Sequence, residues 1–237
     1  MNLTEIGKLY GTDKVTQGFT DVYQVRLEPL RFKVQKLLEV GVFFGASLQM
    51  WRDYFPNAHV LGLDTFTGVD GWTNIWGDGK RSTFPNSDKF LREWKRGVHS
   101  RIQLLVGNQS NEENMRELVN QLRRSPQFDI IVEDGSHLNH DQQTNLAQLL
   151  PLLIPGGLYI MEDLHCSMQS GFDDLRGSYH TTYSTLRRFN RTRAMRSRHL
   201  SIDQSKAIEA SIKSVEIITT RQHKTTSFLS KYVSKYV

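Results

Sequence analysis

Five short apolar runs, rich in β-forming residues, recur along the chain, and segments with helical patterning separate most of them. The runs span Lys36 to Val40, His59 to Asp64, Ile102 to Gly107, Asp129 to Asp134 and Leu158 to Asp163. Strands that alternate with helices along a sequence predict parallel pairing, because each return to the same edge needs a crossover connection. We therefore expect an α/β fold with a doubly wound, mostly parallel sheet and helices on both faces.

Helical periodicity is clearest from Asn111 to Arg124 and from Asp141 to Leu153. The triplet Pro155-Gly156-Gly157 is expected to end the second helix and lead into the next strand. Near the C-terminus, Lys213 to Thr219 and Thr225 to Ser230 flank a polar turn and predict an antiparallel pair. The expected sheet thus has seven strands, the last of them antiparallel.

The chain of 237 residues is expected to form one domain, 1–237, with a helical lead-in at 1–35, because its 38% hydrophobic content can supply one substantial core. It contains no stretch near the roughly 20 consecutive apolar residues of a membrane span. Its start lacks the basic and apolar regions of a signal peptide. A single cysteine, Cys166, excludes an internal disulfide and fits a reducing compartment. We expect a cytoplasmic protein.

The periodic pattern fails between Thr65 and His99, where glycines are interspersed with Trp72, Trp76 and Phe84. A loop that directly follows the carboxyl end of a strand can cover a ligand site, and aromatic side chains offer it apolar surface. We expect the inserted loop 65–99 to be a lid or substrate wall. An ordinary surface insertion whose tryptophans pack onto the sheet is the alternative.

The net charge of +5 is a local feature of one acid-free stretch. That stretch contains six arginines, which leave the rest of the chain close to neutral: Arg187, Arg188, Arg191, Arg193, Arg196 and Arg198. A solvated helix face explains such a stretch, and an anionic partner or phosphate-bearing substrate is the alternative. The basicity alone therefore does not predict nucleic-acid binding.

A turn with two glycines, Gly41 and Gly45, follows the first predicted strand. These glycines let the backbone approach a ligand, and Glu39 just before them can accept hydrogen bonds from a cationic or hydroxylated group. The second strand ends in Asp64, about where a carboxylate binds the hydroxyls of a ribose. This pattern suits an adenosine cofactor. The absence of Gly-x-Gly-x-x-Gly disfavours a dinucleotide, and the acid before the turn suits the amino group of S-adenosylmethionine.

Two predicted strands end in acidic residues followed by a histidine: Glu133 to His137, and Glu162 to His165. Adjacent parallel strands lie roughly 4.8 Å apart, and ligands bind beyond their carboxyl ends. Asp134, Glu162 and Asp163 can therefore converge on one ion. Carboxylate ligation favours a hard cation, Mg²⁺ first, with Mn²⁺ or Ca²⁺ as alternatives.

A histidine follows Asp134 by three residues, in a turn that contains Gly135. With the usual histidine pKa of about 6.5, such a side chain can accept a proton near neutral pH, which makes His137 the expected general base. His140 and His165 are the competitors, as supporting or substrate-contacting groups. Cys166 is expected to be a small buried residue and not a nucleophile.

Taken together, these motifs resemble class I S-adenosylmethionine-dependent methyltransferases, and more narrowly the metal-dependent sugar O-methyltransferases of macrolide tailoring, of the mycinamicin and macrocin type. The same motifs recur in rhamnosyl O-methyltransferase and cephalosporin hydroxylase-like proteins. The segments that carry the resemblance are YGTDK (10–14), LEVG (38–41), SLQMW (47–51), DYFP (53–56), GNQS (107–110), EDGSH (133–137) and GGLYIMEDLH (156–165).

The resemblance implies a Rossmann-like fold, S-adenosylmethionine, a divalent metal and roles for particular residues. The cofactor pocket would contain Thr12, Glu39, Gly41, Gly45, Ser47, Asp64, Asn108, Gln109 and Asp134. The metal ligands would be Asp134, Glu162 and Asp163, and His137 with Asp134 would be catalytic. Asn108 departs from the Gly-Asp-Gln-Ser usual in such enzymes, and the 65–99 insertion is longer than in the macrolide enzymes.

The implied activity is methylation of a sugar hydroxyl on a glycoside, saccharide or natural product. A catechol-like acceptor is an alternative, because it also offers vicinal oxygens to a metal. A nucleic-acid-binding methyltransferase that uses the arginine segment is disfavoured by the acidic site, and a facial iron triad would need two histidines. A non-catalytic scaffold is a third alternative. We expect a small-molecule or saccharide acceptor, with monomer and homo-oligomer both open.

Overall fold

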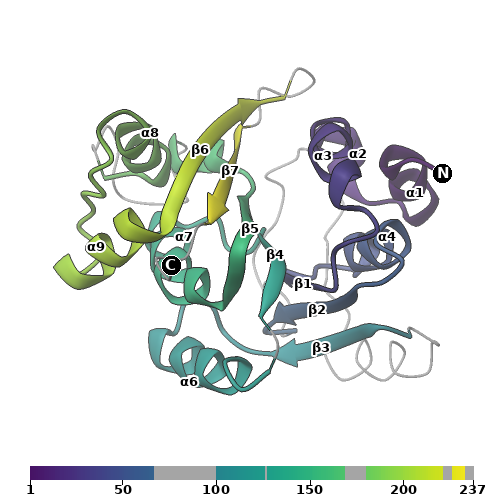
Figure 1. The fold of residues 1–237 in the computed structure, drawn as a ribbon, viewed down its shortest axis with the longest axis horizontal. Coiled ribbons are helices and arrows are strands. Elements are labelled where there is room, and N and C mark those ends of the chain that lie inside the picture. The colour runs from purple at the N-terminus through teal and green to yellow at the C-terminus, as the bar shows by residue number, and fades with distance from the viewer. Residues whose placement is uncertain (67–99, 126, 169–179, 221–225, 233–237) are drawn as a thin grey trace, which may run out of the picture.

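A twisted sheet of seven strands lies at the centre of the molecule, and helices cover both of its faces (Figure 1). The computed structural model describes residues 1–66, 100–125, 127–168, 180–220 and, for the backbone, 226–232. The strand order is β3-β2-β1-β4-β5-β7-β6. The bounds are β1 (Lys36–Val40), β2 (His59–Asp64), β3 (Ile102–Val106), β4 (Phe128–Glu133), β5 (Leu153–Met161), β6 (Ile212–Thr219) and β7 (Thr226–Tyr232).

The helices of the described residues fall into two groups. Those before and after β1 are α1 (Leu3–Tyr10), α2 (Asp13–Thr16), α3 (Phe19–Leu27), the short 3₁₀ helix η1 (Glu28–Leu30) and α4 (Ala46–Tyr54). Those after β3 are α6 (Glu112–Leu122), α7 (Asn139–Leu149), η2 (Leu150–Leu152), η3 (Leu164–Met168), α8 (Thr182–Thr192) and α9 (Ile202–Ser211).

The strand pairing confirms the predicted fold class. β3, β2, β1, β4 and β5 are parallel to their neighbours. β7, the last strand along the chain, is antiparallel to both β5 and β6. Helices α4, α6 and α7 lie in the connections between parallel strands, as crossover geometry requires.

Two boundaries around β5 differ from the prediction. The expected second helix to Leu153 instead ends at Leu149, and η2 follows it. Pro151, which has no N–H to donate, stands in η2 and cannot continue the α-helical hydrogen bonding. β5 then begins at Leu153, so Pro155-Gly156-Gly157 lies inside the strand. The register jumps there from Phe128↔Leu153 to Ile130↔Leu158, which absorbs the triplet as an irregularity.

The N-terminal lead-in packs onto α4 and the sheet. Asn2 and Glu5 form a reciprocal capping box at the start of α1, and Gly11 ends that helix in the left-handed conformation. α1 contacts both α3 and α4. Aromatic rings continue this packing, since Tyr23 of α3 lies 5.8 Å from Trp51 of α4. The short helix α2 is thereby held against the carboxyl edge of the sheet.

Side chains that alternate along the strands form two buried clusters. Leu38, Ile131 and Tyr159 belong to the cluster shared with α6, α7, α8 and α9. Leu37, Ile130, Val132, Leu158 and Ile160 belong to the cluster shared with α1, α3 and α4. Because side chains alternate with a period of two, Glu39, Asp134 and Glu162 continue the rows that face the N-terminal helices.

Backbone hydrogen bonds tie the carboxyl ends of four strands together. Gly41 N donates to Leu63 O (2.8 Å), Asp134 N to Val40 O (2.9 Å) and Glu162 N to Glu133 O (2.9 Å). At Gly41, φ is +89°, and a Cβ there would lie 2.0 Å from the carbonyl oxygen of Asp134. The loop after β1 therefore touches the start of the loop after β4, backbone to backbone.

Two further expectations concern the inserted loop 65–99 and membrane-spanning segments. Beyond Phe66, the predicted lid at 65–99 lies outside the described residues. None of the helices in the described part of the chain has the length and apolar character that a membrane crossing requires.

The Gly41 contact can be tested by comparing two glycines that share a left-handed conformation. Gly11 has a φ of +70° with open space around it, so Gly11→Ala should cost only the backbone term, about 1–2 kcal/mol. Gly41→Ala should cost about 1–3 kcal/mol more, because its Cβ displaces the Asp134 carbonyl. The measurement is the free energy of unfolding in urea. Equal losses for the two variants would contradict the close approach.

Candidate functional site

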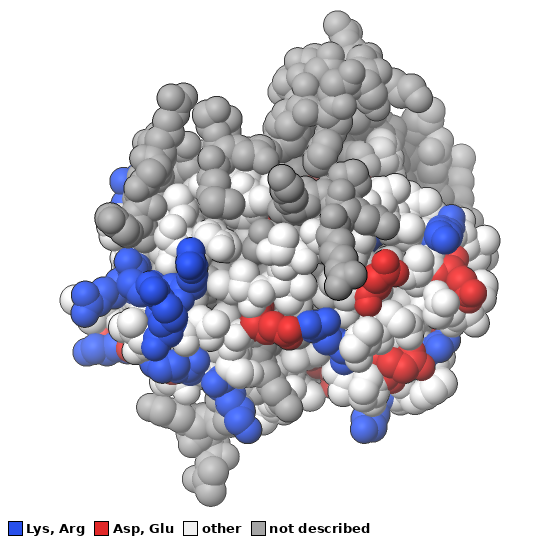
Figure 2. Space-filling model, turned by 90° about the horizontal axis from the view of Figure 1, so that it is seen from above, with Lys and Arg blue, Asp and Glu red and all other residues white. Residues whose placement is uncertain are grey.

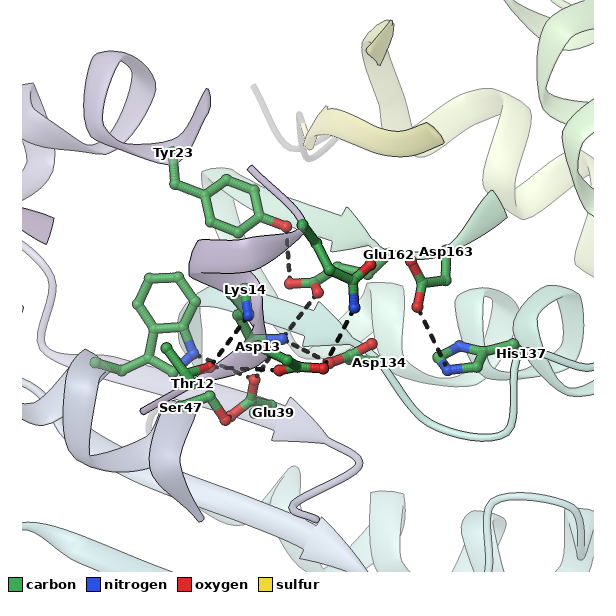
Figure 3. Close-up of polar contacts among 12 residues, drawn as sticks. Thr12, Asp13, Lys14, Tyr23, Glu39, Ser47, Asp134, His137, Glu162 and Asp163 are labelled. Atoms are coloured by element: carbon green, nitrogen blue, oxygen red, sulfur yellow. Dashed lines mark hydrogen bonds and ion pairs between the residues drawn. The ribbon is translucent and has the colours of Figure 1, made fainter. Parts of the chain in front are cut away.

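A buried lysine from α2 lies among carboxylates from three adjacent strands (Figure 3). Lys14 Nζ is 2.5 Å from Asp134 Oδ2, 2.8 Å from Glu162 Oε2 and 3.3 Å from Glu39 Oε1. Its side chain is only 1% exposed. One ammonium group thus joins the N-terminal helices to the ends of β1, β4 and β5.

The charge of this lysine is set by two opposing effects. Burial lowers the pKa of the Lys14 ammonium, but the carboxylates of Asp134, Glu162 and Glu39 outweigh burial and hold the pKa well above its usual value. Lys14 is therefore a permanent cation in the folded protein. Tyr23 supports the same cluster, since its hydroxyl donates to Glu162 Oε1 at 2.8 Å.

Glu39 and Ser47, both expected at the cofactor, are bonded to each other. Glu39 is fully buried, and its Oε2 accepts from Ser47 Oγ at 2.7 Å. Its Oε1 accepts from Trp51 Nε1 at 3.3 Å and also faces Lys14. Burial raises the pKa of Glu39, and Lys14 opposes that shift. Glu39 therefore connects the start of α4 to the lysine.

A second group of side chains converges where β4 and β5 end. One ligand atom from each of Asp134, His137 and Asp163 lies within 4.8 Å of the others, which is a spacing that one metal ion could bridge. His137 Nε2 is 3.7 Å from Asp163 Oδ2. Asp134 belongs to both this group and the Lys14 cluster, and Figure 3 shows it between Lys14 and His137.

His137 and Asp163 both adopt the left-handed backbone conformation, with φ of +60° and +54°. Residues other than glycine enter this region at a cost, and Asp and His do so more readily than most. Phe43 and Phe66, which follow β1 and β2, share it. Strained residues of this kind cluster at functional sites, and here they follow four neighbouring strands.

The converging group overlaps the predicted metal ligands without matching them. Asp134 and Asp163 belong to both sets, whereas the third member of the converging group is His137, the expected general base, and not Glu162. Both carboxylate oxygens of Glu162 already accept a hydrogen bond, one from Lys14 and one from Tyr23. Because a carboxylate oxygen has two lone pairs, Glu162 can still face an ion, and its role as a ligand remains a prediction.

The charge balance of the site fits a divalent cation. Three carboxylates, those of Glu39, Asp134 and Glu162, pair with one lysine, and a fourth, Asp163, lies near Asp134. Burial raises the pKa of Asp163 to about 6, against the opposing effect of His137. Buried carboxylates are costly unless cations offset them. A hard divalent ion with oxygen ligands would supply that offset.

Asp64, predicted to bind ribose hydroxyls, also organises the loops around it. Its Oδ2 accepts from Val42 N at 2.8 Å, and its Oδ1 accepts from Phe66 N at 2.9 Å. The carboxylate therefore holds the loop after β1 beside the loop after β2. Its remaining lone pairs can still meet a ligand.

The other expected cofactor residues lie in loops and helix caps at the same edge. Thr12 caps α2, where its Oγ1 accepts from Lys14 N, and Gly45 begins α4 in the left-handed conformation. Gln109 lies against Gly135, whose absent Cβ would stand 2.0 Å from Gln109 Oε1. Asn108 is exposed, and its side chain accepts from Ser110 N.

The competing histidines and the cysteine take supporting places. His140 turns toward α6, with Nε2 3.3 Å from Glu112 and Nδ1 3.0 Å from Asp141. Burial lowers the pKa of His165. Burial, together with nearby acids, raises the pKa of the Cys166 thiol to about 12. Cys166 is thus the buried, inert residue that was expected.

Sequence reasoning did not assign a role to Lys14 or Tyr23. Lys14 stands in the YGTDK segment, but its partners Asp134 and Glu162 lie 120 and 148 positions away. A pairing at such distance leaves no periodic pattern in a single sequence. The sequence did offer one signal, because Lys14 belongs to the YGTDK segment, which is one of those that carry the resemblance to methyltransferases.

Two of the six arginines between 187 and 198 brace their own segment. Arg188 donates to the carbonyl of Arg196, and Arg193 donates to Ile212 O while its guanidinium lies 4.5 Å from the Phe189 ring centroid. Figure 2 shows basic side chains gathered on the side where Figure 1 places α8 and α9. The exposed members of this segment are Arg187, Arg191, Arg193, Arg196 and Arg198.

Comparison with known proteins shows the family to which the chain belongs. Residues 38–164, more than half of the chain, match the family model described as a methyltransferase domain. The chain is 28% identical over 180 residues to mycinamicin VI 2''-O-methyltransferase of Micromonospora griseorubida, covering 72% of this chain and 38% of that protein. It is 30% identical over 185 residues to L-olivosyl-oleandolide 3-O-methyltransferase of Streptomyces antibioticus, covering 74% and 40%.

Among solved structures, the MycE methyltransferase of the mycinamycin biosynthetic pathway, in complex with Mg and SAH, superposes with a TM-score of 0.71. The sequences are 23% identical, and the match covers 98% of this chain and 55% of that one. The chain belongs to the methyltransferase-domain family and has the class I methyltransferase fold. It spans about two fifths of the length of these two curated relatives.

Glu133, beside the site, gives the fold a distinct dependence on pH. Its side chain is fully buried on the face opposite Asp134. Burial, with help from Asp134 and Asp141, raises the pKa of Glu133 to about 8. Because an unfolded glutamate titrates near 4.3, the folded state binds the extra proton between these values. This group therefore reduces stability progressively as the pH rises from about 4.5 to 8.

Replacing Glu133 by glutamine should remove that loss. The stability of Glu133→Gln relative to the natural protein should rise with pH between 5 and 8, on the order of 1 kcal/mol per pH unit. Urea unfolding at several pH values measures it. Glu117→Gln, at an exposed position of α6, is the matched control and should show a flat difference. A flat difference for Glu133→Gln as well would mean that the carboxyl is not protonated in the fold.

Proposed function

We propose that this protein is a divalent-metal-dependent O-methyltransferase that transfers a methyl group from S-adenosylmethionine to a sugar hydroxyl of a glycoside, saccharide or natural product. The observation that carries the proposal is the convergence of Asp134, His137 and Asp163 beside the Gly41 loop. The names of the relatives support it, since they include O-methyltransferases for olivosyl and rhamnosyl compounds.

In this proposal, Asp134 and Asp163 hold the ion, and Glu162 is the third ligand. A divalent ion bound there would polarise an acceptor hydroxyl and fix its position, which are the two contributions that metal catalysis offers to a weak oxygen nucleophile. Mg²⁺ is the first choice because the donors are mainly carboxylates. The MycE structure, which was solved with Mg, is consistent with this choice.

His137 receives the proton of the reacting hydroxyl. Its ring lies at the edge of the converging group, with Nε2 3.7 Å from Asp163 Oδ2 and 16% of its side chain exposed. That exposure leaves the imidazole accessible to an acceptor. The neighbouring carboxylate Asp163 would then stabilise the imidazolium that forms.

The methyl donor binds at the carboxyl edge of β1, β2 and β3. Gly41 lets the loop after β1 lie directly against Asp134 at this edge, and the buried Glu39 contributes negative charge beneath the donor. The residues proposed to form this pocket are Thr12, Glu39, Gly41, Gly45, Ser47, Asp64, Asn108, Gln109 and Asp134. The sulfonium and the amino group carry positive charge, which suits an edge with surplus carboxylates.

Removal of Asp134 tests the metal-dependent part of the proposal. Asp134→Ala should abolish metal-stimulated methyl transfer, and the fold should be retained with some loss of stability, because Lys14 keeps Glu39 and Glu162 as ion-pair partners. Mass spectrometry of saccharide, glycoside and catechol acceptors, with and without chelator, measures the activity and separates the two acceptor classes. Asp203→Asn, on exposed α9, is the control. Full chelator-sensitive activity in Asp134→Ala would exclude the assignment.

Removal of His137 tests the general base. His137→Ala should bind S-adenosylmethionine nearly as well as the natural protein but turn over about 10² to 10⁴ times more slowly. The pH dependence of the rate should also lose the limb that reports the base. His140→Ala, which removes the outward-turned histidine, should keep both rate and profile. An unchanged pH profile in His137→Ala would argue against a base at this position.

A further inference from the structure

The Lys14 ammonium occupies one oxygen of Asp134 and one of Glu162, and both of these residues belong to the proposed metal site. We propose that Lys14 determines which ion this site prefers, by restricting Asp134 and Glu162 to one-oxygen ligation and so favouring Mg²⁺ over Ca²⁺. The inference rests on the metal site of the proposed function. Lys14 acts through the carboxylates and is a positioning residue.

The distances leave little room for an ion on the same oxygen as the lysine. Lys14 Nζ is 2.5 Å from Asp134 Oδ2. Metal–oxygen bonds measure about 2.0 to 2.6 Å, so an ion that also bound Oδ2 would stand within about 5 Å of the ammonium. Two cations that close in a buried site repel strongly. An ion is therefore directed to the other oxygen of Asp134.

Glu162 is restricted in the same way from two sides. Its Oε2 accepts from Lys14 at 2.8 Å, and its Oε1 accepts from Tyr23 at 2.8 Å. Simultaneous use of both oxygens by one ion would compete with both donors. At most one oxygen remains well placed for a metal.

The lysine is held firmly enough to impose this restriction. It is 1% exposed and also faces Glu39, which Ser47 and Trp51 hold in place. Its helix, α2, is capped by Thr12 and ends before Gly18, which is in the left-handed conformation. The ammonium therefore cannot swing out to solvent when an ion arrives.

The two ions differ in how they use carboxylates. Mg²⁺ requires octahedral geometry with short bonds and binds through one or two carboxylates, keeping several waters. Ca²⁺ takes six to eight oxygen ligands, and a carboxylate often binds it through both of its oxygens. One-oxygen ligands with a fixed orientation thus satisfy Mg²⁺ and leave Ca²⁺ short of ligands.

The experiment measures the ratio of the dissociation constants for Ca²⁺ and Mg²⁺ by calorimetric titration, without methyl donor or acceptor. The natural protein should favour Mg²⁺. In Lys14→Met, the dissociation constant for Ca²⁺ divided by that for Mg²⁺ should fall about tenfold, so that the preference for Mg²⁺ weakens. Tenfold is the low end of the effect on metal affinity of residues that hydrogen-bond to metal ligands. A ratio is used because the loss of one positive charge should change both constants together.

A double variant separates oxygen occupancy from charge. Lys14→Met with Glu39→Gln restores the net charge of the cluster but still lacks the donor to Asp134, so the ratio should remain lowered. This variant buries one fewer unpaired carboxylate, and it carries the test if Lys14→Met alone does not fold. Lys8→Met, at an exposed position of α1, is the control and should keep the natural ratio.

Each outcome has a definite meaning. A lowered ratio in both Lys14 variants supports the inference. If the folded double variant keeps the natural ratio, the inference is overturned. This holds even if the single variant has a changed ratio, because charge and not oxygen occupancy would then be the cause. If the natural protein binds neither ion, the metal site of the proposed function fails first, and the inference fails with it.

Discussion

The site depends on a single ammonium group that offsets carboxylates from three neighbouring strands. Glu39, Asp134 and Glu162 project from β1, β4 and β5 toward the same face, where without a cation their charges would repel one another. Removing one partner from a buried ion pair typically costs several kcal/mol, because the other charge remains buried. The N-terminal helices, which carry Lys14, are therefore part of the site's electrostatic structure.

The same edge of the sheet concentrates backbone strain. Phe43, Phe66, His137 and Asp163 adopt the left-handed conformation after four consecutive strands of the sheet order β2-β1-β4-β5. Each turns the chain sharply just past its strand. This keeps the following side chains close to the strand ends, so the residues of the site are held on the rigid support of the sheet. Such placement limits their conformational freedom before any ligand binds.

The sequence predicted most of the sheet and part of the site. β1 and β2 have the predicted bounds, because the run of β1 ends at the turn that begins with Gly41 and the run of β2 ends at Asp64. The start of β5 was wrong, since Pro155-Gly156-Gly157 has the composition of a turn yet is absorbed within a strand. Asp134 and Asp163 could be placed because parallel strands end at one edge. The lysine that contacts Asp134 and Glu162 could not, because its position depends on how α2 packs on the sheet, which no local pattern encodes.

The contact between Gly41 and the Asp134 carbonyl links two loops that would otherwise be independent. No side chain separates the loop after β1 from the loop after β4, so no rotamer change can absorb a displacement of either loop. A displacement of the turn after β1 toward Asp134 would therefore also displace the segment after β4, because backbone atoms of the two segments are in direct contact. The loop after β1, at the proposed cofactor pocket, and Asp134, at the proposed metal site, are thus in direct contact through backbone atoms.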